Sequence, residues 1–196
     1  MTAKICAIVL AAGRSSRMGE ENKLLLPWRG RTMVRQVAEK ALRAPFADMV
    51  VVTGHQEDQV REALENGPAR LVHNPDYAAG LSTSVRCGVE AAPGADGYAF
   101  LLGDMPQVGI GTLEKLVAAF KSPASLVVPT YQGKRGNPAV IGALYRDELL
   151  SLRGDRGARP LLQNHADRVV EIEVEDAGVR FDIDTPEAYR RTRAPS

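Results

Sequence analysis

The sequence has very little cysteine: Cys6 and Cys87 are the only two in 196 residues, and they lie far apart. Neither belongs to a Cys-x-x-Cys pair or to a Cys/His pattern with metal-ligand spacing. That excludes a disulfide framework and argues against a zinc site. A reducing compartment, the cytoplasm, is the expected location.

The sequence also lacks an excess of either charge, because its 25 Lys and Arg nearly balance its 24 Asp and Glu and leave a net charge of +1. Without a global field, nucleic acid and membrane surfaces are not expected partners, and any anion site must arise from local clustering. No apolar run approaches the ~20 residues that span a bilayer. The N-terminus has no signal-peptide pattern.

Several catalytic signatures are absent too. His55, His73 and His165 share no metal spacing and lie near no nucleophile pattern. No serine sits in a Gly-x-Ser-x-Gly elbow. No pair of glutamates suggests glycosidase chemistry, and no interleaving of aromatic and basic residues suggests nucleic-acid binding.

What the sequence does contain is an alternation of strand-like and helix-like segments. The predicted strands are 4–10, 49–53, 69–73, 97–102 and 125–129, and the predicted helices are 32–44, 57–66, 82–92 and 111–121. Repeated β-α-β units with fully apolar strands predict a doubly wound, Rossmann-like α/β fold. Its mixed sheet should be mainly parallel, with helices on both faces.

The regular alternation of predicted strands and helices ends at residue 130. A glycine-bearing turn and a strand are expected in 130–142, further strands at 168–174 and 179–183, a helix at 185–192 and a frayed tail at 193–196. The sequence has no linker, repeat or low-complexity segment. We therefore expect one domain, residues 1–196, with a single core.

Two loops are expected to share one site. In the commonest strand order the direction of winding reverses between the first and fourth strands, and ligands bind beyond their carboxyl ends. The loop after the first strand is "AAGRSSRMGEENK", and the loop after the fourth is "GDMPQV". Backbone amides and cations of the first could hold phosphates, while Asp104 of the second could hold Mg²⁺.

The first loop is neither a Walker A sequence nor Gly-x-Gly-x-x-Gly. Its glycines permit close backbone approach, and Arg14, Arg17 and Lys23 would supply charge. A tight strand-to-helix turn with solvated arginines is the alternative. For Asp104 the alternative is a turn or N-cap aspartate.

Two further stretches are chemically suggestive. Asp182 and Asp184 are two apart, which in a strand places both carboxylates on one face, although Asp184 could instead begin a helix. Ser82 belongs to a hydroxyl run at an expected helix start, where it could cap the helix or help hold an anion or base. The roles of "RGNPAV" and "GDRGARP" are opaque on physical grounds.

Together these motifs resemble the MobA-like nucleotidyltransferases, and among them the molybdenum cofactor cytidylyltransferase branch. The matching motifs, in order, are "LAAGRSSRMG", "KLLLP", "GLSTSV", "LLGDMP", "RGNPAV", "GDRGAR" and "DIDTPEAY". The resemblance implies a nucleotide-diphospho-sugar transferase type of fold. It also implies transfer of CMP from CTP to the molybdopterin molybdenum cofactor, with release of pyrophosphate. Guanylyltransferases of this family usually read LAGG where this chain has Ala12.

The resemblance also implies roles for individual residues. Arg17, Lys23 and Asp104 would be catalytic, and Mg²⁺ would be held by Asp104 with Asp184 or Asp182. The acceptor side would include Asn137, Pro138, Asp155 and Arg159. The nucleotide would contact Leu10, Ala11, Ala12, Gly13, Arg14, Ser15, Gly80 and Ser82.

Other functions stay open at this point. The same chemistry could use GTP or another phosphate acceptor, such as a sugar phosphate. A dinucleotide-binding oxidoreductase is disfavoured because the chain lacks Gly-x-Gly-x-x-Gly and an acidic residue ending the second strand. A non-catalytic protein that delivers cofactor to a recipient molybdoenzyme remains possible, and delivery could coexist with catalysis.

Overall fold

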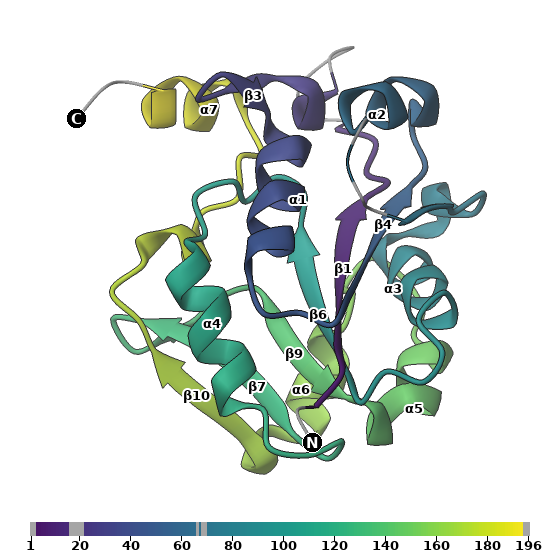
Figure 1. The fold of residues 1–196 in the computed structure, drawn as a ribbon, viewed down its shortest axis with the longest axis vertical. Helices are drawn as coiled ribbons and strands as arrows, with labels where there is room; N and C mark the ends of the chain where they lie inside the picture. The colour runs from purple at the N-terminus through teal and green to yellow at the C-terminus, as the bar shows by residue number, and fades with distance from the viewer. Residues whose placement is uncertain (1–2, 16–21, 66, 68–69, 194–196) are drawn as a thin grey trace.

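The computed structural model describes residues 3–15, 22–65, 67 and 70–193, and a central sheet organises them (Figure 1). Its strand order is β10-β7-β9-β6-β1-β4-β5, with the short β8 paired to β7. The strands are β1 (Ile5–Ala11), β4 (Asp48–Thr53), β5 (Arg70–His73), β6 (Gly97–Leu102), β7 (Leu126–Tyr131), β8 (Lys134–Arg135), β9 (Ala139–Gly142) and β10 (Val169–Glu173). A separate hairpin joins β2 (Pro27–Trp28) to β3 (Arg31–Thr32).

The order β5-β4-β1-β6 confirms the expected reversal of winding between the first and fourth predicted strands. These four strands pair in parallel. Strand β9 runs antiparallel between β6 and β7, and β10 runs parallel to β7. The sheet is therefore mixed and mainly parallel, as the sequence predicted.

Helices cover both faces of the sheet. Helices α1 (Met33–Arg43), α2 (Glu57–Ala63) and α4 (Ile110–Ala119) pack on one face, and Figure 1 shows α1 and α4 crossing in front of it. Helices α3 (Leu81–Glu90), α5 (Arg146–Ser151) and α6 (Arg159–Asn164) pack on the other. Helix α7 (Pro186–Arg193) lies beside β3, near the carboxyl ends of β1 and β6.

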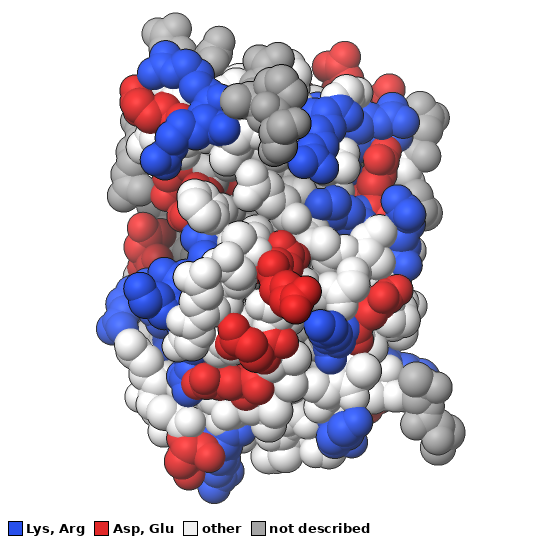
Figure 2. Space-filling model, turned by 90° about the vertical axis from the view of Figure 1, so that its left-hand side faces the viewer, with Lys and Arg blue, Asp and Glu red and all other residues white. Residues whose placement is uncertain are grey.

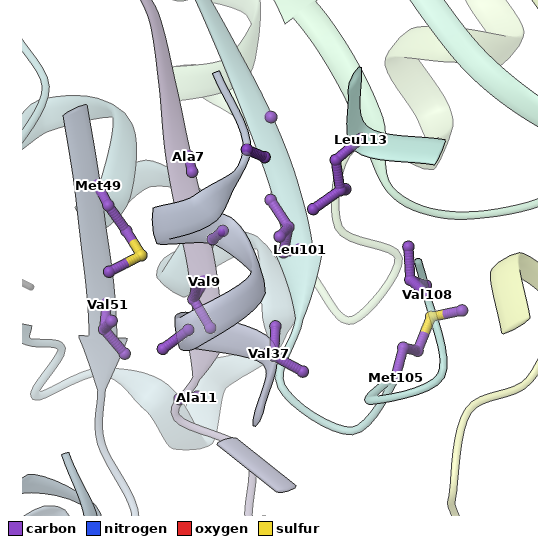
Figure 3. Close-up of a cluster of buried hydrophobic side chains, with 14 of the residues drawn as sticks. Ala7, Val9, Ala11, Val37, Met49, Val51, Leu101, Met105, Val108 and Leu113 are labelled. Carbon is purple, nitrogen blue, oxygen red and sulfur yellow. The ribbon is translucent and has the colours of Figure 1, made fainter. Parts of the chain in front are cut away.

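Strand β1 is buried on both sides, as a central parallel strand must be. Its residues alternate between two core clusters: Ala7, Val9 and Ala11 face α1, whereas Ile8 and Leu10 face α3. Figure 3 shows the first cluster, in which Val37 of α1 lies over β1 and β6. This rigid centre fixes the two loops that leave β1 and β6.

The sequence prediction differs from the structure at two places in the C-terminal third. Residues 179–183 form no strand: the first two end the 3-10 turn Ala177–Arg180, and the Ile183 amide donates to the Asp104 carbonyl instead of to a sheet. The short helices α5 and α6 were not predicted. Each buries a leucine, Leu149 and Leu161, against the cluster on the α3 face.

No helix in the described part of the chain is long and apolar enough to cross a membrane. Cys6 and Cys87 are both free thiols. Burial raises the pKa of the Cys6 thiol to about 12, so that this side chain behaves as a small apolar core residue.

Candidate active site

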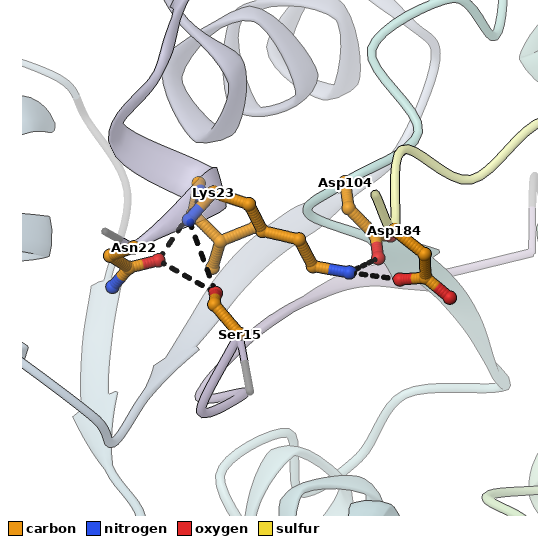
Figure 4. Close-up of polar contacts among 6 residues, drawn as sticks. Ser15, Asn22, Lys23, Asp104 and Asp184 are labelled. Carbon is orange, nitrogen blue, oxygen red and sulfur yellow. Dashed lines mark hydrogen bonds and ion pairs between the residues drawn. The ribbon is translucent and has the colours of Figure 1, made fainter. Parts of the chain in front are cut away.

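The loop that leaves β1 returns to an anchored lysine. Ser15 has a left-handed backbone with φ 52°, and its Oγ accepts a hydrogen bond of 3.1 Å from the Lys23 amide. Asn22 caps the 3-10 turn Lys23–Leu25 by accepting from the Leu24 amide at 3.1 Å, and its carbonyl oxygen also contacts the Ser15 hydroxyl (Figure 4). The two described ends of the loop are thereby closed onto each other.

The Lys23 side chain then reaches two carboxylates from distant parts of the chain. Its Nζ lies 2.5 Å from Asp104 Oδ2 and also contacts Asp184 Oδ1, so the ammonium bridges the two (Figure 4). The side chains of Lys23, Asp104 and Asp184 are 13%, 15% and 31% exposed. We call these three residues the ion cluster.

Within the ion cluster, the two carboxylates stabilise the charged form of Lys23. Burial is the largest single influence on Lys23 and would lower its pKa. The attraction and hydrogen bonds of Asp104 and Asp184 outweigh burial and raise the pKa above its ordinary 10.5. Lys23 is therefore a cation at any physiological pH.

Asp104 is placed by its position after β6. The Gly103 amide donates to the Leu10 carbonyl at 3.1 Å, which ties the end of β6 to β1. A Cβ on Gly103 would lie 3.1 Å from that same oxygen, so the close approach of the two strand ends favours glycine.

The loop after Asp104 is held from two sides. Lys40 of α1 donates to the carbonyls of Pro106 and Val108, at 2.6 and 2.8 Å. Asp176 accepts from the Gly109 amide and the Thr112 hydroxyl, both at 2.7 Å. Neither Lys40 nor Asp176 was predicted from the sequence, because each holds this loop through groups at least 64 residues away.

Asp184 is placed by a small apolar cluster that the sequence analysis also missed. Trp28, Met33 and Ile183 are buried together with Tyr189 packed against them. The Tyr189 hydroxyl donates to the Pro27 carbonyl at 2.7 Å. Only the lone tryptophan beside Pro27 was a hint of this cluster.

The choice between Asp184 as a ligand and as a helix cap is clearer in the structure. Thr185 caps α7, since its hydroxyl accepts from the Ala188 amide at 3.2 Å. Asp184 turns instead toward Lys23. Asp182 is close enough to Asp184 that burial, and then the neighbouring carboxylate, raise the pKa of Asp182 above its ordinary 3.8.

The donor chemistry of the site suits a hard divalent cation. Mg²⁺ in proteins is typically held by one or two carboxylates, with water and substrate phosphates completing the shell. Asp104 and Asp184 offer such a pair from two different segments. Among the described residues no group of three or more His, Cys, Asp or Glu could hold a metal alone.

Other predicted contacts with the nucleotide divide into exposed and buried groups. Gly13 and Arg14 are exposed beyond β1, while Leu10, Ala11 and Ala12 are buried. The Ala12 carbonyl accepts from the His55 amide at 3.3 Å. A Cβ on Gly54 would lie 2.7 Å from the Ala12 Cβ, so the two segments pack directly. Arg17 lies outside the described residues.

The start of α3 is already hydrogen-bonded within the protein. Helix α3 begins at Leu81, so Ser82 lies in its first turn and is not the N-cap that the sequence suggested. The Ser82 amide and hydroxyl both donate to the Gly154 carbonyl, at 3.1 and 2.7 Å. Asp155 accepts from the Leu81 amide at 3.0 Å.

Gly80 permits this contact with the 154–155 loop. Its φ is +112°, and a Cβ there would lie 2.6 Å from the Gly154 carbonyl oxygen. Asn74, which the sequence analysis did not single out, supports the next residues by donating to the hydroxyls of Thr83 and Ser84 at 2.8 and 3.0 Å.

A cavity of about 320 Å³ opens between α3, α6 and the ends of β1 and β6. Its floor is apolar and includes Leu10, Phe100 and Leu102. Its rim carries Asn137 and three arginines, Arg135, Arg156 and Arg159. Among the residues predicted for the acceptor side, Asn137 and Arg159 therefore line this cavity, whereas Asp155 caps α3. Pro138 lies with Asn137 beside Lys40, on a much smaller cavity.

Basic side chains gather at the end of the molecule that carries α7 and β3, and acidic ones lie across the middle of the same face (Figure 2). Exposed arginines at that end are Arg29, Arg31, Arg190 and Arg191. Two of these arginines are paired with carboxylates, Arg31 with Glu39 and Arg190 with Glu187.

The chain is similar to known proteins over nearly its whole length. Residues 7–169 match the family described as MobA-like NTP transferase domain. The chain is 32% identical over 193 residues to the molybdenum cofactor cytidylyltransferase of Escherichia coli K12, covering 94% of this chain and 93% of that protein. It is 31% identical over 195 residues to a protein named nicotine blue oxidoreductase from Paenarthrobacter nicotinovorans, covering 95% of both.

A solved structure shares the fold. Rv0371c from Mycobacterium tuberculosis H37Rv, crystallised in complex with manganese, matches with a TM-score of 0.82 and 32% identity over 96% of this chain and 97% of that one. The fold is therefore that of the nucleotidyltransferases of nucleotide-diphospho-sugar transferase type.

Proposed function

This chain belongs to the family of MobA-like NTP transferase domains, and on that basis we propose that it transfers CMP from CTP to the molybdopterin molybdenum cofactor, releasing pyrophosphate. The observation that carries the proposal is the ion cluster: a lysine and two carboxylates from three distant segments meet beyond the ends of β1 and β6. The reaction needs positive and negative side chains at this place. A cationic side chain would bind the triphosphate, and carboxylates would hold the metal ion that accompanies it.

Asp104 and Asp184 would hold the divalent cation, Mg²⁺ in our proposal. When bound, the cation would neutralise charge at the α-phosphate, where the new bond forms. The manganese complex of Rv0371c, a relative of the same size, supports a divalent metal in this fold. Asp182 is the weaker candidate, because burial and then repulsion from Asp184 raise its pKa, and it makes no described contact with Lys23.

The remaining groups position the triphosphate and its leaving group. The exposed backbone at Gly13 and Arg14 lies where β- and γ-phosphates would be held, and Lys23 would neutralise the α-phosphate or the departing pyrophosphate. The attacking oxygen belongs to a phosphate that is already anionic, so a strong general base is not required. Arg17 would share with Lys23 the neutralisation of the α-phosphate and the departing pyrophosphate.

The acceptor would occupy the cavity beside α3 and α6. An apolar floor with arginines at the rim suits a flat organic body that carries a phosphate. Asn137 and Arg159 would contact it, and Pro138 would shape the adjoining loop. Asp155 would act indirectly, by holding the start of α3.

Cytosine is proposed as the base on two grounds: the alanine at position 12 and the similarity to a cytidylyltransferase. The alternatives are GTP as donor and a different phosphate acceptor. Both free cysteines fit the reducing cytoplasm that we propose as the compartment.

The test is pyrophosphate release measured with each of the four nucleoside triphosphates in Mg²⁺, with and without molybdopterin cofactor. Release with CTP only when the cofactor is present would support the proposal. Release with GTP instead would change the base, and release without cofactor would change the acceptor.

Two negative outcomes would overturn nucleotidyl transfer. Absence of pyrophosphate with every nucleotide, together with tight binding of the cofactor, would indicate a delivery protein for a molybdoenzyme. Oxidation of NADH or NADPH by the purified protein would indicate an oxidoreductase, the activity in the name of one relative. The Asp104→Asn variant serves as the matched control for contaminating pyrophosphatase or phosphatase activity.

A further inference from the structure

The Lys23 ammonium occupies the place between two carboxylates that a divalent cation would need. We propose that Lys23 is an exchangeable counterion: it holds Asp104 and Asp184 together in the ligand-free protein, and it leaves them for the triphosphate when a metal–nucleotide complex binds. This inference rests on the proposed function for its metal and its triphosphate. It adds that lysine and metal compete for the same oxygens.

The geometry makes the two occupants mutually exclusive. Lys23 Nζ contacts Asp104 Oδ2 and Asp184 Oδ1 at the same time, and all three side chains are largely buried. The carboxylate oxygens that hold the ammonium are those that Asp104 and Asp184 would offer to a divalent cation, so the two cations would compete for them. Figure 4 shows the lysine tip pointing at both carboxylates and in contact with each.

Charge explains why some cation must always be present. Asp104 approaches from the end of β6 and Asp184 from the segment before α7, and Asp182 adds a third carboxyl group close by. Carboxylates that contact the same ammonium lie close enough to repel each other strongly where water is partly excluded. Without an occupant the two carboxylates would repel each other, so the ammonium keeps the site assembled.

Lys23 is built to change partners without moving its backbone. Its amide is fixed to the Ser15 hydroxyl, and the neighbouring Leu24 is buried. The side chain is flexible and carries a point charge, so it can rotate from carboxylate to phosphate. The exposed Gly13 and Arg14, where we place the phosphates, belong to the same loop as Ser15.

The exchange has a functional consequence. A free metal ion must displace the Lys23 ammonium from the carboxylates, so it binds weakly. A metal ion bound to a triphosphate brings its own anion, and that anion pairs with the displaced ammonium. The site thus favours the complete metal–nucleotide complex over either part alone. The measurable signature is that removal of Lys23 should strengthen the binding of bare metal although it weakens catalysis.

The experiment measures Mn²⁺ binding without nucleotide, by the loss of the free-ion electron paramagnetic resonance signal during titration. We expect Lys23→Met to bind Mn²⁺ at least about tenfold more tightly than the wild type, because a competing charge has been removed. Lys23→Arg keeps that charge and should stay within about threefold of the wild type. Addition of CTP should tighten Mn²⁺ binding in the wild type more than in Lys23→Met.

Two further variants check the location of the effect. Lys115→Met removes the same charge from an exposed position of α4 and should leave Mn²⁺ binding unchanged. Adding Asp104→Asn to Lys23→Met should abolish the gain. The melting temperature of each variant, read by circular dichroism, shows that the protein titrated is folded.

The outcomes separate this inference from the proposed function. Mn²⁺ binding by folded Lys23→Met that is equal to or weaker than the wild type overturns the exchange, even if the wild type releases pyrophosphate from CTP. Tighter binding that survives Asp104→Asn also overturns it. A wild type that releases no pyrophosphate from any nucleotide defeats the proposed function, while the competition between lysine and metal would still stand on the Mn²⁺ data.

Discussion

On the α1 side of the sheet's carboxyl end, Lys23, Asp104 and Asp184 point at one another as charged groups from three distant segments. On the α3 side, the polar groups of Leu81 and Ser82 are hydrogen-bonded to Gly154 and Asp155. Both regions carry motif residues of the family. In the first region the contacts join ionised side chains to one another, whereas at the start of α3 they tie backbone amides and a serine hydroxyl to the 154–155 loop.

The difference teaches how to interpret a motif residue in a structure. A buried backbone amide that already has a partner gains little by switching to a ligand, because it must give up one hydrogen bond to form another. A pair of carboxylates joined by an ammonium is different, since a divalent cation satisfies the same oxygens with more charge. We therefore expect substitutions of Lys23 and Asp104 to affect catalysis and substitution of Asp155 to affect stability.

The largest effect is expected for Asp104→Ala. Loss of a metal-holding carboxylate should reduce pyrophosphate release from CTP by at least about a hundredfold. The melting temperature should change little, because the Asp104 carbonyl that accepts from Ile183 is retained. Full turnover by the variant in saturating Mg²⁺ would contradict the assignment.

Lys23→Ala comes next. We expect kcat/KM for CTP to fall at least about tenfold, equivalent to about 1.4 kcal/mol of transition-state stabilisation. Steady-state kinetics with varied CTP provide the measurement. An unchanged kcat/KM would mean that the lysine serves only to neutralise the carboxylates.

Asp155→Ala tests the α3 side. Removal of the carboxylate that accepts from Leu81 at 3.0 Å should lower the free energy of unfolding by about 1 kcal/mol, the usual cost of losing a helix cap. Urea denaturation measures this, and turnover at saturating substrates should stay within about twofold. A tenfold fall in turnover at unchanged stability would instead place Asp155 in contact with a substrate.

The smallest effect is expected for Asp182→Asn. Burial and the nearby Asp184 raise the folded-state pKa of Asp182 above 3.8, so the protonated form favours folding and the ionised form opposes it. The favourable contribution is complete below pH 3.8 and disappears as the pH rises through the folded-state pKa. The variant should therefore be slightly more stable than the wild type at pH 7, by less than about 1 kcal/mol.

Denaturation at pH 7 and pH 3 checks this expectation, since the difference between variant and wild type should shrink at the lower pH. Activity should remain within about twofold of the wild type, in contrast to Asp184→Asn, which should resemble Asp104→Ala. If Asp182→Asn and Asp184→Asn lose activity equally, both carboxylates serve the metal.

The sequence predicted secondary structure best where a short run of residues is buried as a whole. The apolar runs 4–10, 49–53 and 97–102 became β1, β4 and β6, because a strand covered on both faces must be apolar. The run 69–73 became the edge strand β5, which is only partly buried, and the four strands stand in the expected order. That order is what brought Lys23 and Asp104 into one predicted site. Strand β9 entered between β6 and β7, a pairing that depends on contacts distant in sequence.

The errors occurred where distant segments complete each other's hydrogen bonds. Ser82 looked like an N-cap, but the Gly154 carbonyl takes its amide and hydroxyl. Residues 179–183 resembled a strand, yet the Ile183 amide pairs with the loop after β6. The supports of the site, Lys40, Asn74 and Asp176, bond to groups at least nine residues away in sequence, so no local pattern predicts them.

The packing of Ile183 against Trp28 and Met33 has a consequence for synthesis on the ribosome. The nascent chain can form β1, β4 and β6 and their covering helices before the segment around Ile183 has been made. It cannot bring Asp184 to Lys23 until Ile183 has docked. A product that terminates before these residues would retain most of its sheet but would lack the second carboxylate, so competence for chemistry is reached only after Ile183 and Asp184 have been synthesised.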